Sequence, residues 1–224
     1  MNLILKFLSF CQRVLIYLNV IIWGGKGKIL VFHEVDIENL HHVEPSSFCT
    51  VKRFSEIINK YKGNFYSIDD FLKDNRGNGV VVSFDDVPES MFINAYPLLK
   101  KNRIPFIIYV CPKFVDETGF LSKQQLLELA KDPLCTIGAH TMNHKRLRYE
   151  TDSFADMYDS KVFLERLINK KVVHFAYPFG RATSVSKRNI REARKAGFKS
   201  AVSTLPTTVS QRFNYWFIPR MVEN

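Results

Sequence analysis

Acidic residues and histidines follow several apolar, β-branched runs of this chain, and these residue types can bind a metal ion and move protons. The runs are KILVFHE (28–34), GVVVSFDD (79–86), LCTIGAHTMNH (134–144) and VVHFAYPFG (172–180). His140 and His144 are four residues apart, so one helical turn or a tight loop can direct both imidazoles at one ion. Asp85 and Asp86 are adjacent, so one carboxylate can bind the ion while the other accepts a proton. The pattern predicts a metal-dependent enzyme.

Two histidines and one aspartate leave coordination positions open for water and substrate. His33 follows the first apolar run and is the best-placed candidate to protonate a leaving nitrogen. Imidazole and carboxylate ligands suit Zn best, with Co, Ni or Mn as alternatives. Each residue also has a structural interpretation: capping or surface histidines, an Asp before a helix start at Pro88, and a core or loop His33.

Strand-like and helix-like segments alternate from Lys28 onward, and these elements must position the polar side chains. We expect strands at 28–33, 64–68, 79–84, 104–110, 135–139, 172–177 and 199–203. We expect helices at about 51–62, 89–102, 122–131, 153–169 and 184–196. This alternation predicts an α/β fold with a largely parallel sheet, open or closed into a barrel. Functional residues of such folds lie at the carboxyl ends of the strands, which is where all four polar segments occur.

The chain resembles the polysaccharide deacetylase family in SFDD (83–86), HTMNH (140–144), AYPFG (176–180) and FIPR (217–220). The resemblance implies a single-domain, distorted (β/α) barrel of about seven strands that removes acetyl groups from N-acetylated sugars with a divalent metal. It implies that Asp85 is the general base and that Asp86, His140 and His144 are the metal ligands.

The same resemblance implies that Tyr177, Pro178 and Phe179 line the substrate groove and that a backbone N–H helps to hold the oxyanion. We add Arg181 to these substrate-binding candidates. An early VFHEV segment (31–35) resembles that of biofilm poly-N-acetylglucosamine deacetylases and supports His33 as the catalytic acid. The remaining histidines match no motif and are expected to be structural or exposed: His41, His42 and His174.

Two positions depart from the family pattern. The first motif usually ends in Gly, where this chain has Val87, and the third commonly begins with an Arg that supports the catalytic Asp, where this chain has Ala176. Arg181 or Arg220 is a candidate to replace that Arg.

The composition is that of one globular domain, with 46% hydrophobic and 24% charged residues among 224. A net charge of +10 favours an anionic neighbour, although it also serves solubility. The basic residues are spread along the chain rather than gathered in one stripe, so we expect no nucleic-acid partner. Four cysteines without a framework do not require an oxidising compartment.

Residues 1–24 are apolar but are interrupted by Lys6, Gln12, Arg13 and Asn19, which makes them a poor membrane span and a poor secretory signal. An amphipathic helix before a domain at 25–224 fits best, and it either contacts a membrane surface, packs on the domain or acts as an anchor. A cytoplasmic or inner-membrane peripheral location is favoured, with export as the alternative.

The sequence therefore favours a metal-dependent carbohydrate N-deacetylase. A non-catalytic glycan-binding relative and a metal hydrolase of another ester or amide bond are the alternatives.

Overall fold

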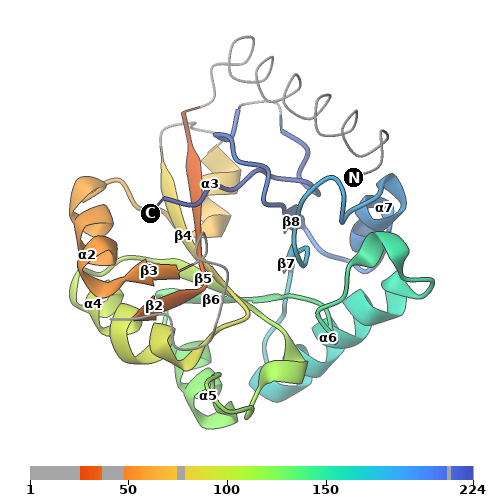
Figure 1. Ribbon diagram of the computed structural model, residues 1–224, viewed down its shortest axis with the longest axis horizontal. Coiled ribbons are helices and arrows are strands. Elements are labelled where there is room, and N and C mark those ends of the chain that lie inside the picture. The colour runs from red at the N-terminus through yellow and green to blue at the C-terminus, as the bar shows by residue number, and fades with distance from the viewer. Residues whose placement is uncertain (1–25, 37–47, 75–78, 211–212, 224) are drawn as a thin grey trace.

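A curled sheet of six parallel strands forms the centre of the molecule (Figure 1). The computed structural model describes residues 26–36, 48–74, 79–210 and 213–223. Along the sheet the strands are β1 (Lys28–Phe32), β4 (Val80–Asp85), β5 (Phe106–Val110), β6 (Cys135–Ala139), β7 (His174–Ala176) and β8 (Ser200–Val202). Because all neighbours are parallel, every strand delivers its carboxyl end to the same rim.

Five helices surround this sheet in Figure 1: α2 (Val51–Lys60), α4 (Tyr96–Lys101), α5 (Lys123–Lys131), α6 (Ser153–Ile168) and α7 (Lys187–Lys195). A π-helical segment, η2 (Met91–Ala95), leads into α4, and two short 3-10 turns are η3 (Pro112–Phe114) and η4 (Leu147–Tyr149). Each of the five helices runs back toward the amino ends of the strands, as parallel connections require.

Side-chain caps fix where three of these helices begin. The hydroxyl of Thr50 accepts the Arg53 N–H at the start of α2. Ser122 and Ser186 form reciprocal capping boxes with Gln125 and Asn189 at the starts of α5 and α7. Gly197 follows α7 with a φ of 82°, a left-handed conformation that suits glycine at the end of a helix.

Alternation along the strands divides the core into two layers. Residues such as Val82 and Ile108 face the surrounding helices, whereas Val81 and Ile107 face the inside of the curl. The inner layer is covered by a short helix, α3 (Ile68–Asp74), which contributes Ile68, Phe71 and Leu72. Helix α3 therefore covers the inner layer of the core at the side opposite the polar rim.

The segment 218–221 joins the two edge strands of the sheet. Ile218 forms a bridge with Val202 of β8, and Met221 forms one with Leu30 of β1. The Met221 N–H donates to the Ile29 carbonyl at 3.0 Å. This segment closes the open side of the curl and carries Arg220 into its interior.

The predicted α/β class, parallel sheet and single domain are confirmed, with six strands in the main sheet where about seven were expected. Segment 64–68 is not a strand: Phe65 makes one bridge to Val80, and the chain then enters α3. Two short paired strands, β2 (Glu34–Asp36) and β3 (Phe48–Thr50), were not predicted.

The predicted helix at 1–24, together with His41 and His42, lies outside the described residues. Within the described part of the chain, no helix has the length and apolarity to cross a membrane.

Candidate active site

The carboxyl rim of the sheet brings the predicted chemical groups together. Asp85 is the last residue of β4 and Asp86 follows it. His33 comes directly after β1, and His140 comes directly after β6. Their convergence follows from the parallel register, which places the ends of adjacent strands side by side.

Asp86, His140 and His144 form a cluster whose ligand atoms all lie within 4.8 Å of one another. Asp86 Oδ1 lies 3.1 Å from Nε2 of His144 and 3.5 Å from Nε2 of His140. The same oxygen is buried and makes no hydrogen bond with a described residue. An orphaned carboxylate oxygen facing two imidazole nitrogens fits a divalent ion, since the ion would supply the missing partner.

The imidazole of His140 is held in the tautomer that a ligand needs. Its Nδ1 donates to the Ala176 carbonyl at 2.8 Å, which leaves the lone pair of Nε2 directed at Asp86. Burial lowers the pKa of His140 to about 3 and also lowers the pKa of His144. Burial raises the pKa of Asp86 to about 6. Both histidines are therefore neutral at pH 7, as metal-binding imidazoles are.

Left-handed backbone conformations are concentrated around this cluster. Asp86 and Val87 have φ of 57° and 62°, and Thr141, His144 and Phe179 have φ of 62°, 54° and 62°. A β-branched residue such as Val87 rarely adopts this conformation, which glycine adopts readily. Departure from the usual Gly therefore introduces backbone strain next to Asp86, and the surrounding fold maintains it.

Arg220 binds Asp85 through two hydrogen bonds, from Nη1 to Oδ1 at 2.7 Å and from Nη2 to Oδ2 at 2.5 Å. Arg220 also donates to the Ser83 hydroxyl and to the Ser203 carbonyl. Burial alone would raise the pKa of Asp85, but the guanidinium outweighs it and holds this pKa well below the usual range. Asp85 is thus ionised and oriented, as a general base must be.

Of the two candidates, Arg220 is therefore the one that supports Asp85 in place of an Arg at position 176. Arg181 is exposed in the turn after β7, where its N–H donates to the Phe179 carbonyl. Sequence alone could not choose between the two because 135 positions separate Arg220 from Asp85.

His33 lies close enough to both carboxyls to act on them. After burial, its charge is the strongest influence on the pKa of Asp86, and it also lowers the pKa of Asp85. The imidazole is half-buried, and its Nδ1 makes no hydrogen bond with a described residue. This nitrogen is itself buried, so it needs a polar partner that the described residues do not supply.

The three aromatic-motif residues have different surroundings. Tyr177 is fully buried, its hydroxyl donates to the Trp216 carbonyl at 2.8 Å, and its N–H donates to the Val202 carbonyl at 3.1 Å. Pro178 is buried as well. Phe179 is 41% exposed, and its ring centroid lies 5.0 Å from that of His144. Of the three side chains, Phe179 is the one placed to meet substrate.

Sequence reasoning missed Arg146, whose guanidinium lies 4.0 Å from the centroid of the Phe179 ring. Arg146 also donates to the Ser184 hydroxyl at 2.9 Å, so the Phe179 ring has a fixed cationic neighbour. Its position two residues after His144 was the available signal, because residues next to a ligand loop tend to lie near the site.

His174 belongs to the opposite end of the sheet, as a structural residue. Its Nδ1 lies 2.8 Å from the Ser200 hydroxyl and its Nε2 lies 3.4 Å from Asp69 Oδ1. The ring is buried and links β7 to β8 and α3, which confirms its structural assignment.

Known proteins share this fold and part of this sequence. A curated relative, the poly-beta-1,6-N-acetyl-D-glucosamine N-deacetylase of Staphylococcus aureus, is 28% identical over 192 residues, which are 79% of this chain and 61% of the relative. The chain thus spans about three fifths of the length of such curated relatives.

Two solved structures have the same fold. The deacetylase PplD of Streptococcus pyogenes, solved with acetate, superposes with a TM-score of 0.78 at 22% identity, over 88% of this chain and 92% of that one. IcaB of Ammonifex degensii gives a TM-score of 0.75 at 22% identity, over 90% of this chain and 93% of that one. Residues 73–201, more than half of the chain, match the polysaccharide deacetylase family. The chain therefore belongs to the polysaccharide deacetylase family.

Proposed function

We propose that this protein is a metal-dependent hydrolase that removes acetyl groups from the N-acetylated sugars of a poly-N-acetylglucosamine-like glycan. Family membership and the name of the Staphylococcus aureus relative support the reaction and the substrate class. The observation that carries the proposal is the ionised Asp85, fixed by Arg220 beside the donor cluster of Asp86, His140 and His144.

Asp86, His140 and His144 would hold the ion. A divalent ion, with Zn best suited to these ligands and Co, Ni or Mn as alternatives, supplies a Lewis acid to the site. The chain prepares this cluster by burying His140 and by fixing its tautomer through the Ala176 carbonyl.

Asp85 and His33 would divide the proton transfers between them. The Asp85 carboxylate accepts a proton from water while the water oxygen attacks the carbonyl carbon of the acetyl group. His33 donates a proton to the sugar nitrogen as the C–N bond breaks, so that acetate and a free amine leave. The low pKa of Asp85 makes it a weak base, which is compatible with this role because Arg220 fixes its orientation.

Phe179 would contact the sugar beside the reacting acetamide. Its exposed ring offers an apolar surface, and the Arg146 guanidinium on the ring keeps it in place.

Acetate release from N-acetylated glucosamine oligomers, together with metal content by mass spectrometry, tests this proposal. We expect Asp85→Asn to lose turnover while it keeps its metal, and His144→Ala to lose both. His33→Ala should lower turnover with metal retained. Arg191→Ala, at an exposed position of α7, is the matched control and should remain active. Acetate release by Asp85→Asn at the wild-type rate would contradict the assignment of the base.

The binding-only alternative rested on the two departures at Ala176 and Val87. Arg220 removes the first ground, because it supports Asp85 from a different segment. Metal bound at one equivalent without acetate release from any N-acetylated oligomer would restore that alternative.

A further inference from the structure

Positive charge is concentrated on the side of the molecule opposite the active site. This side, here called the basal face, consists of the last turn of each surrounding helix and the turn that follows it: 57–65, 98–105, 128–134, 165–173 and 192–199. These segments contain twelve Lys and Arg residues and four Asp and Glu residues, and helix α3 on the same side adds Lys73 and the acids Asp69, Asp70 and Asp74.

The active-site face does not share this excess. It consists of the connections that leave the carboxyl ends of the strands: 86–90, 111–122, 140–152, 177–186 and 203–210. These segments contain five Lys and Arg residues and six Asp and Glu residues. The positive charge is therefore unevenly distributed along the axis of the curled sheet, with its excess on the basal face.

The helix dipole explains part of the basal charge, because cations are stabilising near helix C-termini. It does not explain the residues beyond the last turn, such as Lys62, Arg103 and Lys199, since the effect falls off within one turn. Ion pairs with described residues use Lys60, Lys100 and Lys171. Several other basal cations form no ion pair with a described residue: Lys62, Lys101, Arg103, Lys131, Arg166 and Lys199.

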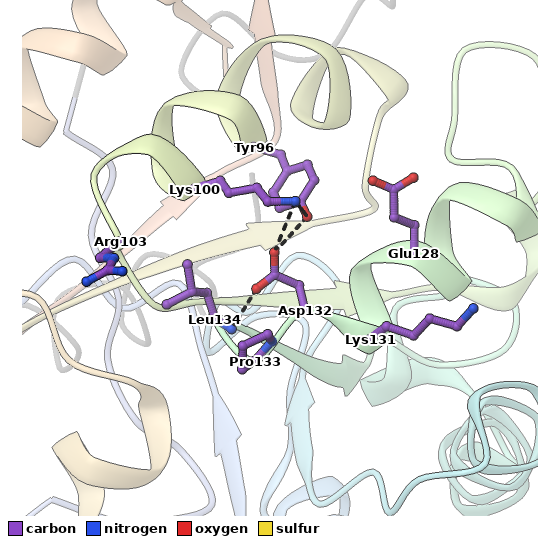
Figure 2. A pocket seen from close by; sticks show the side chains of 8 residues that line it. All are labelled: Tyr96, Lys100, Arg103, Glu128, Lys131, Asp132, Pro133 and Leu134. Carbon is purple, nitrogen blue, oxygen red and sulfur yellow. Dashed lines mark hydrogen bonds and ion pairs between the residues drawn. The ribbon is translucent and has the colours of Figure 1, made fainter.

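A groove between α4 and α5 hollows the basal face (Figure 2). Lys100, Arg103 and Lys131 line it around a hydrogen bond of 2.7 Å from the Tyr96 hydroxyl to Asp132 Oδ2. Glu128 lines the groove as well, so its three cationic side chains outnumber its two carboxylates by one.

The apolar N-terminal sequence joins the body of the protein at this same face. Strand β1 begins at Lys28, and parallel pairing with β4 places its first residue on the basal side. Residues 1–24 are rich in Leu, Ile, Phe and Val and carry two cations, Lys6 and Arg13. An apolar sequence that leads into a cationic surface suits a bilayer with anionic headgroups, whereas a soluble polyanion would use only the charge.

We propose that the basal face docks on an anionic phospholipid bilayer, so that the catalytic rim points away from the membrane toward a glycan in the aqueous phase. Residues 1–24 and the basal cations would contribute together, because either apolar burial or charge alone gives only weak, reversible binding. Added salt would weaken the docking by screening the charges.

Co-sedimentation of the full chain with vesicles tests the charge component. Wild type should bind phosphatidylcholine vesicles that contain phosphatidylglycerol and should bind pure phosphatidylcholine vesicles far less. Lys62→Glu/Lys101→Glu/Lys131→Glu should lower the partition coefficient on anionic vesicles by about 100-fold or more.

The matched control reverses three exposed lysines at the opposite ends of helices, Lys52→Glu/Lys123→Glu/Lys187→Glu. It changes the net charge equally and places acids in first helical turns, where they are stabilising. Circular dichroism checks that both variants fold, and the control should bind almost as wild type does. Equal losses in both variants, no loss in either, or equal binding to neutral vesicles would each overturn the proposal.

Lysine acetylation by a soluble reagent, read by mass spectrometry on wild type with and without anionic vesicles, tests the orientation independently. Lys62, Lys101 and Lys131 should be protected by vesicles, whereas Lys52, Lys123 and Lys187 should react as in solution. Protection of the second set alone would reverse the proposed orientation, and uniform protection would show no oriented docking.

Discussion

A single ion pair determines the state of the proposed base. Asp85 is 2% exposed and Arg220 is 1% exposed, so neither charge can rely on water. The two hydrogen bonds compensate the carboxylate and fix its plane, and the Ser83 hydroxyl gives the guanidinium a further acceptor. A buried pair of this kind contributes mainly by preventing an uncompensated charge, and its removal from one side is costly.

This ion pair predicts part of the acid sensitivity of the fold. The pKa of Asp85 lies below that of an unfolded Asp, which is about 3.9. Its contribution to stability is therefore fully present above that value and is lost as pH falls toward the folded pKa. The melting temperature of wild type should fall more steeply than that of Asp85→Asn between about pH 5 and pH 3. Parallel pH profiles would show that Asp85 contributes no such linkage.

Val87 predicts an unusual order of two substitutions. Its left-handed backbone costs about 1–3 kcal/mol, whereas burial of a valine side chain contributes about 1.5–3 kcal/mol. The two effects roughly offset each other, which explains how Val replaces the usual Gly. Val87→Gly should therefore leave the free energy of unfolding nearly unchanged, whereas Val87→Ala should lower it by about 1 kcal/mol because only Gly relieves the strain. Urea unfolding measures both, and the ordinary order, with Gly worse, would contradict the strain argument.

Elements built on long apolar runs were the predictable part of this fold. The runs at 79–84 and 104–110 are central strands covered on both faces, so their composition reported their burial directly. The strand prediction at 64–68 was wrong because Ile68 belongs to α3, whose apolar residues cover the inner layer of the core. Strands β2 and β3 are three residues each, too short for a periodic signal.

The site was predictable where motifs lie at strand ends, and less so where distant contacts decide. The three expected ligands converge, since parallel strands fix their neighbourhood. The Tyr177 hydroxyl finds its acceptor at Trp216 and its ring contacts Phe217, and the stacking of Arg146 on Phe179 depends on two separate loops. Such packing between segments far apart in sequence leaves no local pattern.

Gly138 predicts a steric conflict inside β6. A Cβ at this position would lie 2.5 Å from Tyr109 Cδ1 and 3.1 Å from the His174 carbonyl oxygen. Gly138→Ala should therefore destabilise by about 1–3 kcal/mol in urea unfolding. Tyr109→Leu should reduce that cost in the double variant, because the clash is with its ring.

Gly63→Ala is the contrast for this prediction, since Gly63 has a φ of 81° and open space around its Cβ position. Its cost should be limited to backbone strain and should not change with Tyr109→Leu. Additive effects of Gly138→Ala and Tyr109→Leu would contradict the steric explanation.

At the scale of the whole molecule, the segment 218–221 connects the two edges of the curled sheet. It bridges β1 to β8 and supplies Arg220 to β4, so closure of the fold and support of the base depend on the same few residues. This segment also explains why six strands suffice where about seven were expected.

Deletion of residues 218–224 should cost more stability than Arg220→Met. Arg220→Met leaves Asp85 without its partner and should lower the free energy of unfolding by about 3–5 kcal/mol. It keeps the backbone bridges of residues 218–221. Hydrogen exchange should show faster amide exchange in β1 and β8 of the deletion variant than in Arg220→Met. Equal stability and equal exchange in the two proteins would mean that the bridges contribute nothing.

The late position of Arg220 in the chain also bears on biosynthesis. The ribosome releases β1 and β4 well before residues 218–221, which bridge β1 to β8 and bring Arg220 to Asp85. Without residues 218–221, a sheet that had already formed would lack the partner of Asp85 and would keep unpaired edges, which other chains can pair with. Synthesis of this segment would cover the edges and supply the proposed base with its counter-charge in the same event.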